Sequence, residues 1–307
     1  MMMRFSDKRR RPPARPTYGL VINQQAAEFS QDKIDRLVKG IAGARANWHM
    51  IKAETPREAV YQIKKFMGRR PLAIVACGGD STVNLVARHL IRRTCILGIL
   101  PLGRFNNLYR SLYGEPSLDR AIDHILSGKN RRIDYGLAGN NFFLGSVGFG
   151  LIPEMLSMLE SRRLPRFGLS WSRLAARAAA AIKPIRSKIT IDEFKFDITP
   201  SILNVNLLQS SSGLPLSPSS LDDDGKAEII FDTAPGQTLS SSFVRKTLKK
   251  KYIYGDEIRL YRGTKVSVTP IGSRVMYLDG ELMEPGGASL DVEIFPNKIR
   301  VFTPREA

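Results

Sequence analysis

The chain has 307 residues, enough for two domains, and its 43% hydrophobic content allows it to bury a core. No run of 18 or more residues is continuously apolar, and the basic amino terminus lacks the apolar segment of a signal peptide, so we expect neither a membrane-spanning helix nor secretion. The two cysteines, Cys77 and Cys95, stand in apolar surroundings. We expect reduced core thiols in a cytoplasmic protein.

The net charge of +18 is concentrated in three segments. Residues 1–15 contain six basic residues and one acidic residue, 155–190 contain eight and one, and 240–265 contain eight and two. A basic surface of this size attracts an anionic partner, for which nucleic acid and an anionic membrane surface are the two candidates. The alternative is a solvated surface that only keeps the protein soluble.

The first 132 residues predict a basic arm followed by an α/β domain. Residues 1–16 have the composition of a disordered arm. Strands are predicted at 18–23, 72–76 and 96–100, and helices at 34–41, 56–67, 82–91 and onward to about 126. Short strands that alternate with helices predict a doubly wound parallel sheet over residues 17–132.

After residue 132 the strands come in hairpins. Two strands at 133–137 and 142–147 flank a Gly139-Asn140-Asn141 turn, and a helical stretch over about 151–183 ends at Pro184. Further strands are predicted at 188–191, 195–198, 202–208, 227–231, 257–261, 265–269, 275–278, 291–295 and 300–302. We expect residues 133–290 to form a mainly antiparallel β-sandwich and residues 291–307 to return to the first domain.

Gly78-Gly79-Asp80 lies between an apolar strand and a helix. Glycines let the backbone approach phosphate oxygens, and the helix N-terminus supplies positive potential. Asp80 adds a carboxylate suited to Mg²⁺ or its waters. The alternative is a tight strand–helix turn in which Asp80 caps the helix, and a lone Gly-Gly-Asp does not decide between them.

A second loop, Pro101-Leu102-Gly103-Arg104-Phe105-Asn106-Asn107, follows the next strand. Adjacent parallel strands would bring both loops to the carboxyl edge of the sheet, where open α/β folds bind their ligands. With what surrounds them, these loops resemble the diacylglycerol kinase catalytic-domain family. That family includes bacterial lipid kinases and sphingosine kinases and is related to the NAD kinases. The resemblance extends over about residues 17–304.

Five segments carry the resemblance in the right order. Residues 78–84 are similar to the family's Gly-Gly-Asp-Gly-Thr-Val-Asn loop, 101–107 to its Pro-Leu-Gly-Thr-Gly-Asn-Asp loop, Asp134 to the aspartate that opens the second domain, 218–225 to Pro-x-Ala-x-x-Asp-Asp-Gly, and 279–281 to Asp-Gly-Glu. There are also departures from the pattern: Ser81 replaces a glycine, Arg104-Phe105 replaces Thr-Gly, Asn107 replaces an aspartate, and Asn23-Gln24-Gln25 matches the first Asn-Pro loop in part.

The resemblance implies the following roles. ATP would lie between the domains against Gly78, Gly79, Asp80, Ser81, Thr82, Gly103, Arg104, Asn106 and Asn23. Asp80 and Asp134 would organise Mg²⁺, and Asp279, with Glu281 beside it, would be the general base for the acceptor hydroxyl. Taken alone, Asp279-Gly280 is more typical of an ordinary hairpin turn, and it is the surrounding motifs that favour the catalytic role.

A separate structural Mg²⁺ is implied at Asp224 with the carbonyl groups of Leu221 and Lys226. The alternative is a solvated acidic turn at residues 222–225.

Residues 151–186 combine an apolar stripe with six arginines. The apolar residues are Leu151, Met155, Leu159, Phe167, Trp171, Leu174, Ala178 and Ile182, and the arginines are Arg162, Arg163, Arg166, Arg173, Arg177 and Arg186. The pattern is typical of a helix in a membrane interface, and equally of a helix packed on its own domain with its arginines in solvent. Lys249-Lys250-Lys251, with Tyr252 and Tyr254, would extend the same surface.

We therefore predict an ATP- and Mg²⁺-dependent kinase of diacylglycerol or a similar lipid alcohol. It would be peripheral on the inner face of a membrane, and a homodimer is compatible with the sequence. Three alternatives stand beside this: a kinase of a soluble acceptor such as NAD, disfavoured by residues 279–281; a weak or inactive nucleotide-binding homologue, suggested by Ser81, Phe105 and Asn107; and nucleic-acid binding by the basic arm. The arm lacks interleaved aromatic residues, so we expect no nucleic-acid partner.

Overall fold

The computed structural model describes residues 15–160, 171–210, 214–232, 246–247, 249, 258–272 and 275–304. Statements about the absence of a feature refer to these residues. Some predicted features lie outside them: the arm up to residue 14, Phe167 of the apolar stripe, three of the arginines, and parts of the basic segment. The arginines are Arg162, Arg163 and Arg166, and the parts of the basic segment are 240–245, 248 and 250–257.

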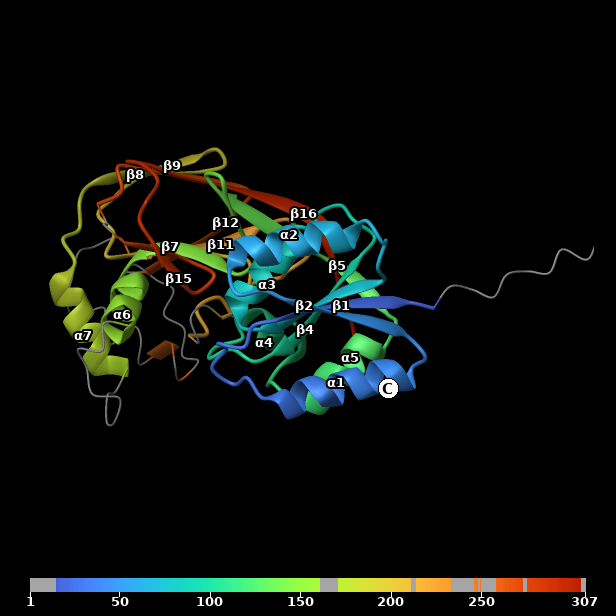
Figure 1. Ribbon diagram of the computed structural model, residues 1–307. Coiled ribbons are helices and arrows are strands. Elements are labelled where there is room, and N and C mark those ends of the chain that lie inside the picture. The colour runs from blue at the N-terminus through green and yellow to red at the C-terminus, as the bar shows by residue number, and fades with distance from the viewer. Residues whose placement is uncertain are drawn as a thin grey trace, which may run out of the picture.

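The first half of the chain alternates strands with helices, as the sequence predicts. The elements are β1 (Thr17–Ile22), α1 (Gln31–Gly43), β2 (Asn47–Lys52), α2 (Pro56–Met67), β3 (Ala73–Gly78), α3 (Asp80–Ala87), β4 (Ile96–Pro101), α4 (Asn107–Tyr113) and α5 (Leu118–Leu126). The strands pair in parallel in the order β2-β1-β3-β4, with α2 and α3 on one face of the sheet and α1 and α5 on the other (Figure 1). This confirms the predicted parallel α/β domain.

Local sequence explains where these elements begin and which face they bury. In α2, the Thr55 hydroxyl accepts a hydrogen bond from the Glu58 N–H and Pro56 occupies the first turn, both of which favour a helix start. In α1, Ile34, Leu37 and Ile41 form one buried stripe at helical spacing. All six residues of β3 are buried, as expected of a central parallel strand.

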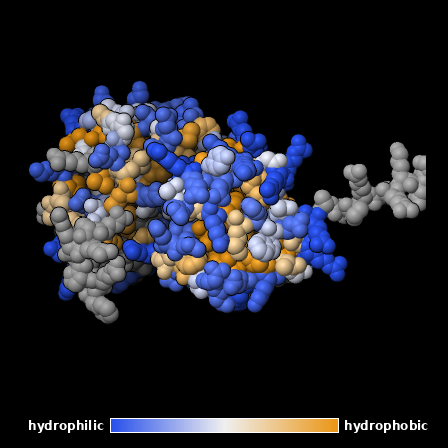
Figure 2. Space-filling view, in the orientation of Figure 1, coloured by the Kyte–Doolittle hydropathy of each residue, from blue (hydrophilic) through white to orange (hydrophobic). Residues whose placement is uncertain are grey.

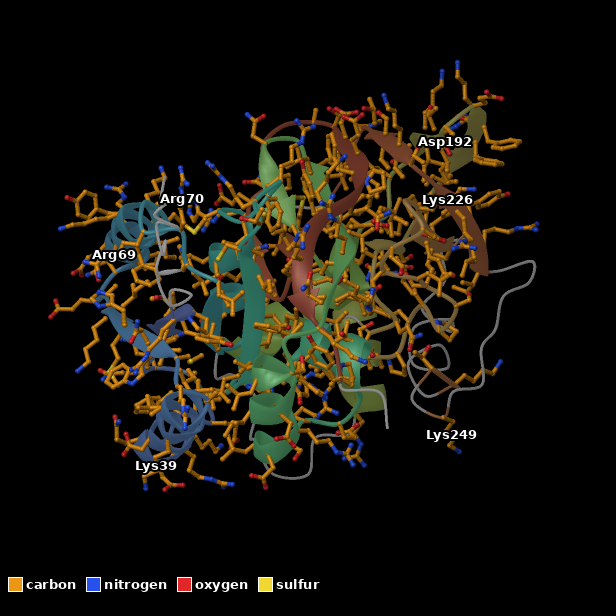
Figure 3. The ribbon with its side chains drawn as sticks, turned by 90° about the vertical axis from the view of Figure 1, so that its right-hand side faces the viewer. Lys39, Arg69, Arg70, Asp192, Lys226 and Lys249 are labelled. Atoms are coloured by element: carbon orange, nitrogen blue, oxygen red, sulfur yellow. The ribbon has the colours of Figure 1, made fainter. Side chains whose placement is uncertain are left out.

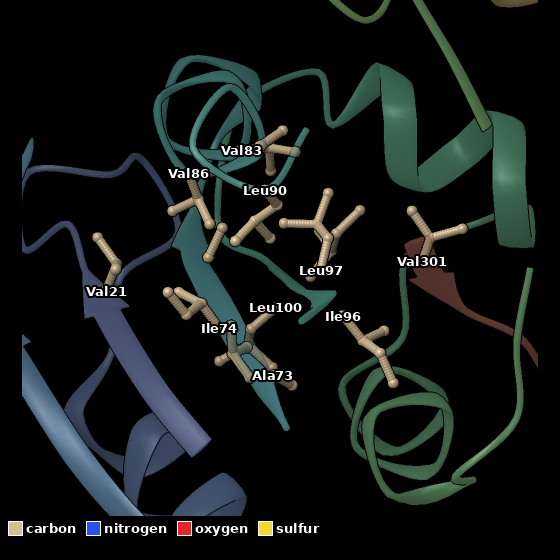
Figure 4. Close-up of a cluster of buried hydrophobic side chains, with 14 of the residues drawn as sticks. Val21, Ala73, Ile74, Val83, Val86, Leu90, Ile96, Leu97, Leu100 and Val301 are labelled. Carbon is tan, nitrogen blue, oxygen red and sulfur yellow. The ribbon is translucent and has the colours of Figure 1, made fainter. Parts of the chain in front are cut away.

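The core of this half lies between the sheet and its helices. Figure 4 shows Ile74 of β3, Val86 of α3 and Leu97 of β4 in one cluster. Val301 belongs to the same cluster although it comes from the end of the chain, and it pairs with Leu97 across parallel strands. The last strand is therefore part of the first core.

The second half is mainly antiparallel. Its elements are β5 (Asn130–Ala138), β6 (Asn141–Phe143), β7 (Ser146–Gly150), α6 (Leu151–Glu160), α7 (Trp171–Ala181), β8 (Ser187–Ile191), β9 (Phe194–Ile198), β10 (Ile202–Asn206), β11 (Ala227–Asp232), β12 (Ile258–Gly263), β13 (Lys265–Thr269), β14 (Met276–Leu278), β15 (Glu281–Met283) and β16 (Leu290–Phe302). Six strands form an antiparallel sheet in the order β12-β11-β10-β7-β14-β15. Its inner face packs on β8, β13 and β16, which confirms the predicted β-sandwich.

Strand β16 joins the two halves. It pairs antiparallel with β13 and β5, and at Val301 it pairs in parallel with β4, so the large sheet continues from one half into the other. The predicted boundaries at 132 and 290 coincide with β5 and β16. Because both strands belong to this shared sheet, the boundaries stay a prediction.

Helices α6 and α7 form a layer on the outer face of the antiparallel sheet (Figure 1). Leu151 and Met155 of α6 and Leu174 and Ala178 of α7 are buried in a third apolar cluster. The described part of the apolar stripe therefore packs on the protein itself. The arginines of α7 that are described, Arg173 and Arg177, are exposed.

Basic side chains project from both halves of the molecule. Figure 3 shows Lys39, Arg69 and Arg70 pointing outward from the first half and Lys226 and Lys249 from the second. On the face seen in Figure 2, hydrophilic residues separate small hydrophobic areas. No helix in the described part of the chain is both long and apolar enough to cross a bilayer.

Candidate active site

The two predicted loops meet at the carboxyl edge of β3 and β4. Glycines make this contact possible: a Cβ atom on Gly103 would lie 2.4 Å from the Cα atom of Gly79, which no side chain tolerates. The Leu102 N–H also donates to the Gly78 carbonyl at 3.0 Å. Gly78, Gly79 and Gly103 therefore give the edge a smooth, side-chain-free backbone surface beside the N-terminus of α3.

Asparagine side chains fix the shape of these loops. The backbone of Asn106 is in the left-handed region, with φ 51°. Its side chain closes the second loop: it accepts a hydrogen bond from the Gly103 N–H at 2.9 Å and donates one to the Gly103 carbonyl at 2.8 Å. Asn23, after β1, donates to the Thr82 hydroxyl at 3.2 Å. The structure thus brings Asn23, Thr82 and Asn106 to one edge together with the glycines.

Asp80 does not cap its own helix. Its carboxylate instead reaches the start of α4, where it accepts hydrogen bonds from the Asn107 side-chain amide and the Leu108 N–H, both at 3.2 Å. The side chain is half-buried, and this burial raises the pKa of Asp80 to about 6. The hydrogen bonds from Asn107 and Leu108 oppose the shift, and the charge of Asp279 adds to it.

Asp279 lies in the tight turn between β14 and β15, with φ 49°, and the following Gly280 has φ 90°. The hairpin turn expected as the alternative is therefore present, but the side chain is turned inward. Its four hydrogen-bond donors are Leu144 N–H (2.7 Å), Asn84 amide (2.8 Å), Gly145 N–H (2.7 Å) and Ser146 N–H (2.9 Å). Burial raises the pKa of Asp279, and these donors counteract the rise.

Asp80 and Asp279 line one pocket between the two halves of the molecule. The pocket is small, with about 10 Å³ open to the centre of a water-sized sphere, roughly the room for one water molecule. Its other lining residues are Val83, Asn107, Leu108, Leu144, Gly145, Ser146 and Leu208. Because the carboxylate of Asp80 borders this small space, the pocket suits a divalent cation or a hydroxyl group. Asn84 and the backbone of residues 144–146 were not predicted to contribute, although Asn84 belongs to the matched loop.

The donor set around Asp80 fits a partly hydrated Mg²⁺. Oxygen atoms of Asp80 and Asn107 are of the type that Mg²⁺ prefers, and Mg²⁺ usually keeps waters and phosphate oxygens among its ligands. Within the described residues, no group of three or more histidine, cysteine, aspartate or glutamate side chains is arranged around a common point. A cation here would therefore need the nucleotide and water to complete its coordination.

Asp134 lies in a different environment. It accepts a hydrogen bond from the Asn297 N–H at 2.7 Å and one from the Gly225 N–H at 2.6 Å, so backbone amides occupy both of its oxygens. Burial raises its pKa. The Asp134 N–H also donates to the Asp222 carbonyl at 2.7 Å. The structure thus places Asp134 with the acidic turn rather than with the phosphate loops.

The acidic turn itself is paired with arginines. Asp222 forms a two-pronged ion pair with Arg131 at 2.5 and 2.7 Å, and Asp224 pairs with Arg262. The other oxygen of Asp224 accepts from the Lys226 N–H at 3.0 Å, and Leu221 is exposed. The magnesium site predicted at Asp224, Leu221 and Lys226 therefore competes with an ion pair and stays a prediction.

The remaining predicted residues do not line the pocket. Ser81 is half-buried beside Asp80, while Arg104 and Glu281 are exposed. Phe105, which departs from the family pattern, packs against the apolar cluster of α6 and α7. The substitution therefore ties the second loop to the other half of the molecule.

Comparison with known proteins agrees with this arrangement. A family model described as "Diacylglycerol kinase catalytic domain" matches residues 17–138, and a model described as "YegS C-terminal NAD kinase beta sandwich-like domain" matches residues 145–303. The chain is 26% identical over 237 residues to a diacylglycerol kinase of Bacillus subtilis, covering 75% of this chain and 78% of that protein. It is 26% identical over 231 residues to a Staphylococcus aureus protein named "putative lipid kinase", covering 74% and 75%.

A solved structure shows the same fold. The crystal structure of a "putative diacylglycerol kinase" from Bacillus anthracis matches with a TM-score of 0.76 and 19% sequence identity, over 94% of this chain and 96% of that chain. With both family models matching in order along the sequence, the chain belongs to the diacylglycerol kinase catalytic-domain family and has its YegS-like C-terminal domain.

Proposed function

We propose that this protein is an ATP- and Mg²⁺-dependent lipid kinase that phosphorylates the hydroxyl group of diacylglycerol or a similar lipid alcohol. The observation that supports this best is the pocket in which Asp80 faces Asp279 beside the glycine-lined edge of the sheet. Phosphoryl transfer needs alignment and charge neutralisation more than an unusual nucleophile, and this edge offers both.

In this mechanism the glycine loops bind the nucleotide phosphates. The first N–H groups of α3 have no partner inside the helix and point toward an anion placed there. Gly79 and Gly103 leave the backbone open to close approach. Mg²⁺, bound through Asp80 and water, would neutralise charge on the phosphates.

Asp80 is the better candidate for the general base. All four donors to Asp279 lie at 2.7–2.9 Å and fill both of its oxygens, whereas the hydrogen bonds to Asp80 from the Asn107 side chain and the Leu108 N–H are longer, at 3.2 Å. Asp80 would accept the proton of the acceptor hydroxyl. The oxygen of that hydroxyl would form a bond to the γ-phosphorus of ATP as the bond from this phosphorus to ADP breaks and ADP leaves. Asp279 would position the backbone of residues 144–146 along the acceptor side of the pocket.

The test is a transfer assay with purified protein, γ-labelled ATP, Mg²⁺ and a total lipid extract. A labelled lipid that appears with the wild type, and not with Asp80→Asn, supports the proposal. Label that enters NAD in a parallel reaction, with none in lipid, would assign the protein to a soluble acceptor. Label in neither, despite measurable ATP binding, would support the inactive homologue suggested by Asn107.

Attachment to an anionic membrane is part of the proposal. Because Leu174 and Ala178 pack inward, the attraction would come from basic side chains such as Arg173, Arg177 and Arg186. Each basic residue near an anionic bilayer is worth about 1 kcal/mol and less at high salt. Changing these three to glutamine should reduce sedimentation with anionic vesicles, with no effect on neutral ones. Equal sedimentation of variant and wild type would contradict the membrane role.

A further inference from the structure

The pocket of Asp80 and Asp279 has two walls, one from each half of the molecule. The wall of the first half comes from α3 and the start of α4, with Asp80, Val83, Asn107 and Leu108, and the wall of the second half comes from Leu144, Gly145, Ser146, Leu208 and Asp279. Between the walls there is room for about one water-sized group. A gap of this width admits one hydroxyl oxygen, so a small change in its width changes what it admits.

Asn84 links the two walls. It lies one turn after Asp80 on α3, so the two side chains project from the same side of the helix. The side-chain amide of Asn84 donates to the Phe142 carbonyl at 2.9 Å and to the Asp279 carboxylate at 2.8 Å, and both acceptors belong to the second half. An amide group has two N–H donors, and Asn84 uses both of them to join the halves.

The contact with Asp279 connects Asn84 to the backbone of the second wall. The oxygen that accepts from Asn84 also accepts from the Leu144 N–H at 2.7 Å, and the other oxygen accepts from the next two N–H groups of the chain at 2.7 and 2.9 Å. The packing is close, because a Cβ atom on Gly145 would lie 2.9 Å from that second oxygen. The position of Asn84 therefore determines where residues 144–146 lie relative to α3.

Apolar packing contributes to the same separation. Val83, Leu144 and Leu208 belong to one buried core, and all three line the pocket. Val83 comes from α3, between Asp80 and Asn84 in the sequence, so its side chain limits the room beside the Asp80 carboxylate. The width of the gap thus depends on Asn84 through its hydrogen bonds and on Val83 through its volume.

The width matters because water and a lipid hydroxyl compete for the γ-phosphoryl group. Either oxygen can form a bond to the γ-phosphorus as the bond from this phosphorus to ADP breaks, while Asp80 accepts the proton. The product is a phosphorylated lipid in one case and inorganic phosphate in the other. Closed active sites prevent such hydrolysis by excluding water. A gap that holds one oxygen has no room for water once the acceptor hydroxyl is in place.

We propose that Asn84 is a positioning residue that keeps this gap one oxygen wide and thereby directs the phosphoryl group to the lipid rather than to water. The proposal rests on the lipid kinase function proposed above, with Asp80 as the base. Asn84 acts through Asp279 and the backbone of residues 144–146, without touching the nucleotide or the acceptor. Loss of its amide lets the walls separate, so that a water molecule fits beside the acceptor hydroxyl.

The test measures, in one reaction, how the labelled phosphoryl group is divided between lipid and water. Purified protein is incubated with γ-labelled ATP, Mg²⁺ and a saturating total lipid extract in detergent micelles. Asn84→Ala should lower the rate of lipid phosphorylation about 10- to 100-fold, because the reacting groups are misplaced. The ratio of labelled phosphate to labelled lipid should rise about tenfold or more. The KM for ATP should stay within about twofold, because the glycine loops are unchanged.

Val83→Ala widens the same gap without touching the amide, since it removes two methyl groups from the pocket lining. It should raise the ratio of phosphate to lipid several-fold, and it carries the test if Asn84→Ala does not fold. Tyr113→Phe is the matched control. It removes a hydrogen bond of the same kind, from a side chain to the distant Phe302 carbonyl at 2.7 Å, at a residue that does not line the pocket. This variant should lower the melting temperature and leave the ratio at the wild-type value.

The outcomes separate the two proposals. A ratio that stays at the wild-type value in both Asn84→Ala and Val83→Ala would overturn the positioning role and leave the lipid kinase function standing. A ratio that rises equally in Tyr113→Phe would show that any loss of stability opens the site, and it would also overturn the specific role of Asn84. Absence of labelled lipid with the wild type would overturn both proposals.

Discussion

Two acidic regions of this molecule were predicted to bind Mg²⁺, and they differ in what surrounds their carboxylates. Around Asp134, the carboxylate oxygens accept from the backbone at Gly225 and Asn297, and the neighbouring aspartates of the 222–224 turn pair with Arg131 and Arg262. Around Asp80, the carboxylate faces a pocket and a second carboxylate. The carboxylates around Asp134 connect three segments that are distant in the sequence. The carboxylate of Asp80 lies where a ligand can reach it.

This contrast shows that the number of acidic residues does not identify a metal site. The 222–224 turn has three aspartates in a row, yet all three lie within ion-pair distance of Arg131 or Arg262, and neighbouring Asp134 accepts from backbone amides. Asp80 is a single aspartate, but burial and the charge of Asp279 raise its pKa to about 6. Burial raises the pKa of Asp134 as well, so what distinguishes Asp80 is that its carboxylate borders a pocket, whereas two backbone amides occupy that of Asp134.

The largest expected effect follows from replacing the carboxylate of Asp80, which lines the pocket. Asp80→Asn keeps the shape of the side chain and its place beside Leu108, but removes both the base and the metal ligand. Turnover in the lipid assay should fall by about 10³-fold, within the range of general-base replacements. The circular dichroism spectrum should match that of the wild type. If turnover stays within tenfold of wild type, Asp80 has only a structural role, in connecting α3 to α4.

Asp279→Ala should act mainly on stability. It leaves four N–H donors, those of Asn84, Leu144, Gly145 and Ser146, without their acceptor. The free energy of unfolding in urea should decrease by about 3 kcal/mol. Glu281→Ala, on the same hairpin but exposed, is the control and should stay within about 0.5 kcal/mol of wild type. If both variants unfold alike, the inward carboxylate does not organise residues 144–146.

Asp134→Ala tests the other region. Loss of the acceptor for the Gly225 and Asn297 N–H groups should cost about 2 kcal/mol of unfolding free energy. The Mg²⁺ concentration for half-maximal turnover should not change, because the amides already occupy the carboxylate. Asp223→Ala, an exposed neighbour, serves as the control for stability. A several-fold rise in the Mg²⁺ concentration for half-maximal turnover would show instead that Asp134 contributes to Mg²⁺ binding.

The sequence predicted the fold and the identity of the loops better than it predicted the partners of their side chains. Alternating strands and helices, and glycines after β3 and β4, are local features that the chain shows directly. The contact of Asp80 with the start of α4 depends on how α3 and α4 pack, and the partners of Asp134 come from residues 225 and 297. Such contacts depend on tertiary packing and leave no local pattern.

The outer face of β10 and β11 illustrates a second limit. In Ile202–Asn206 the polar Asn204 and Asn206 alternate with apolar residues, and in Ala227–Asp232 Glu228 and Asp232 share one face with Ile230. Polar residues at alternate positions normally predict a solvent-facing side. The cover formed by α6, α7 and Leu216 buries that side instead. Equally, the apolar stripe of 151–186 is typical of a membrane helix and of a packed helix, because both environments bury apolar surface.

Smaller effects are expected in the pH dependence of stability and of turnover. Since the pKa of Asp80 is raised to about 6, the folded state holds this proton more tightly than the unfolded chain does, and the carboxyl's contribution to stability is lost as pH rises from about 4 through 6. Turnover should show the opposite trend and fall about tenfold per pH unit below 6. Saturating Mg²⁺ should move this acidic decline in turnover to lower pH. If Mg²⁺ leaves the pH of the decline unchanged, Asp80 does not bind the metal.

The smallest expected effect concerns Asn107, whose amide donates to Asp80 where the family has an aspartate. Asn107→Asp removes that donor and adds a second negative charge beside Asp80. Without a cation the two carboxylates repel each other, so the apo variant should melt at a lower temperature than the wild type. With Mg²⁺ the repulsion becomes attraction for the ion, and the concentration for half-maximal turnover should fall a few-fold. Turnover that drops at every Mg²⁺ concentration would instead mean that Arg104 and Phe105 have adapted this loop to an amide, and that the uncharged side chain is part of the working site.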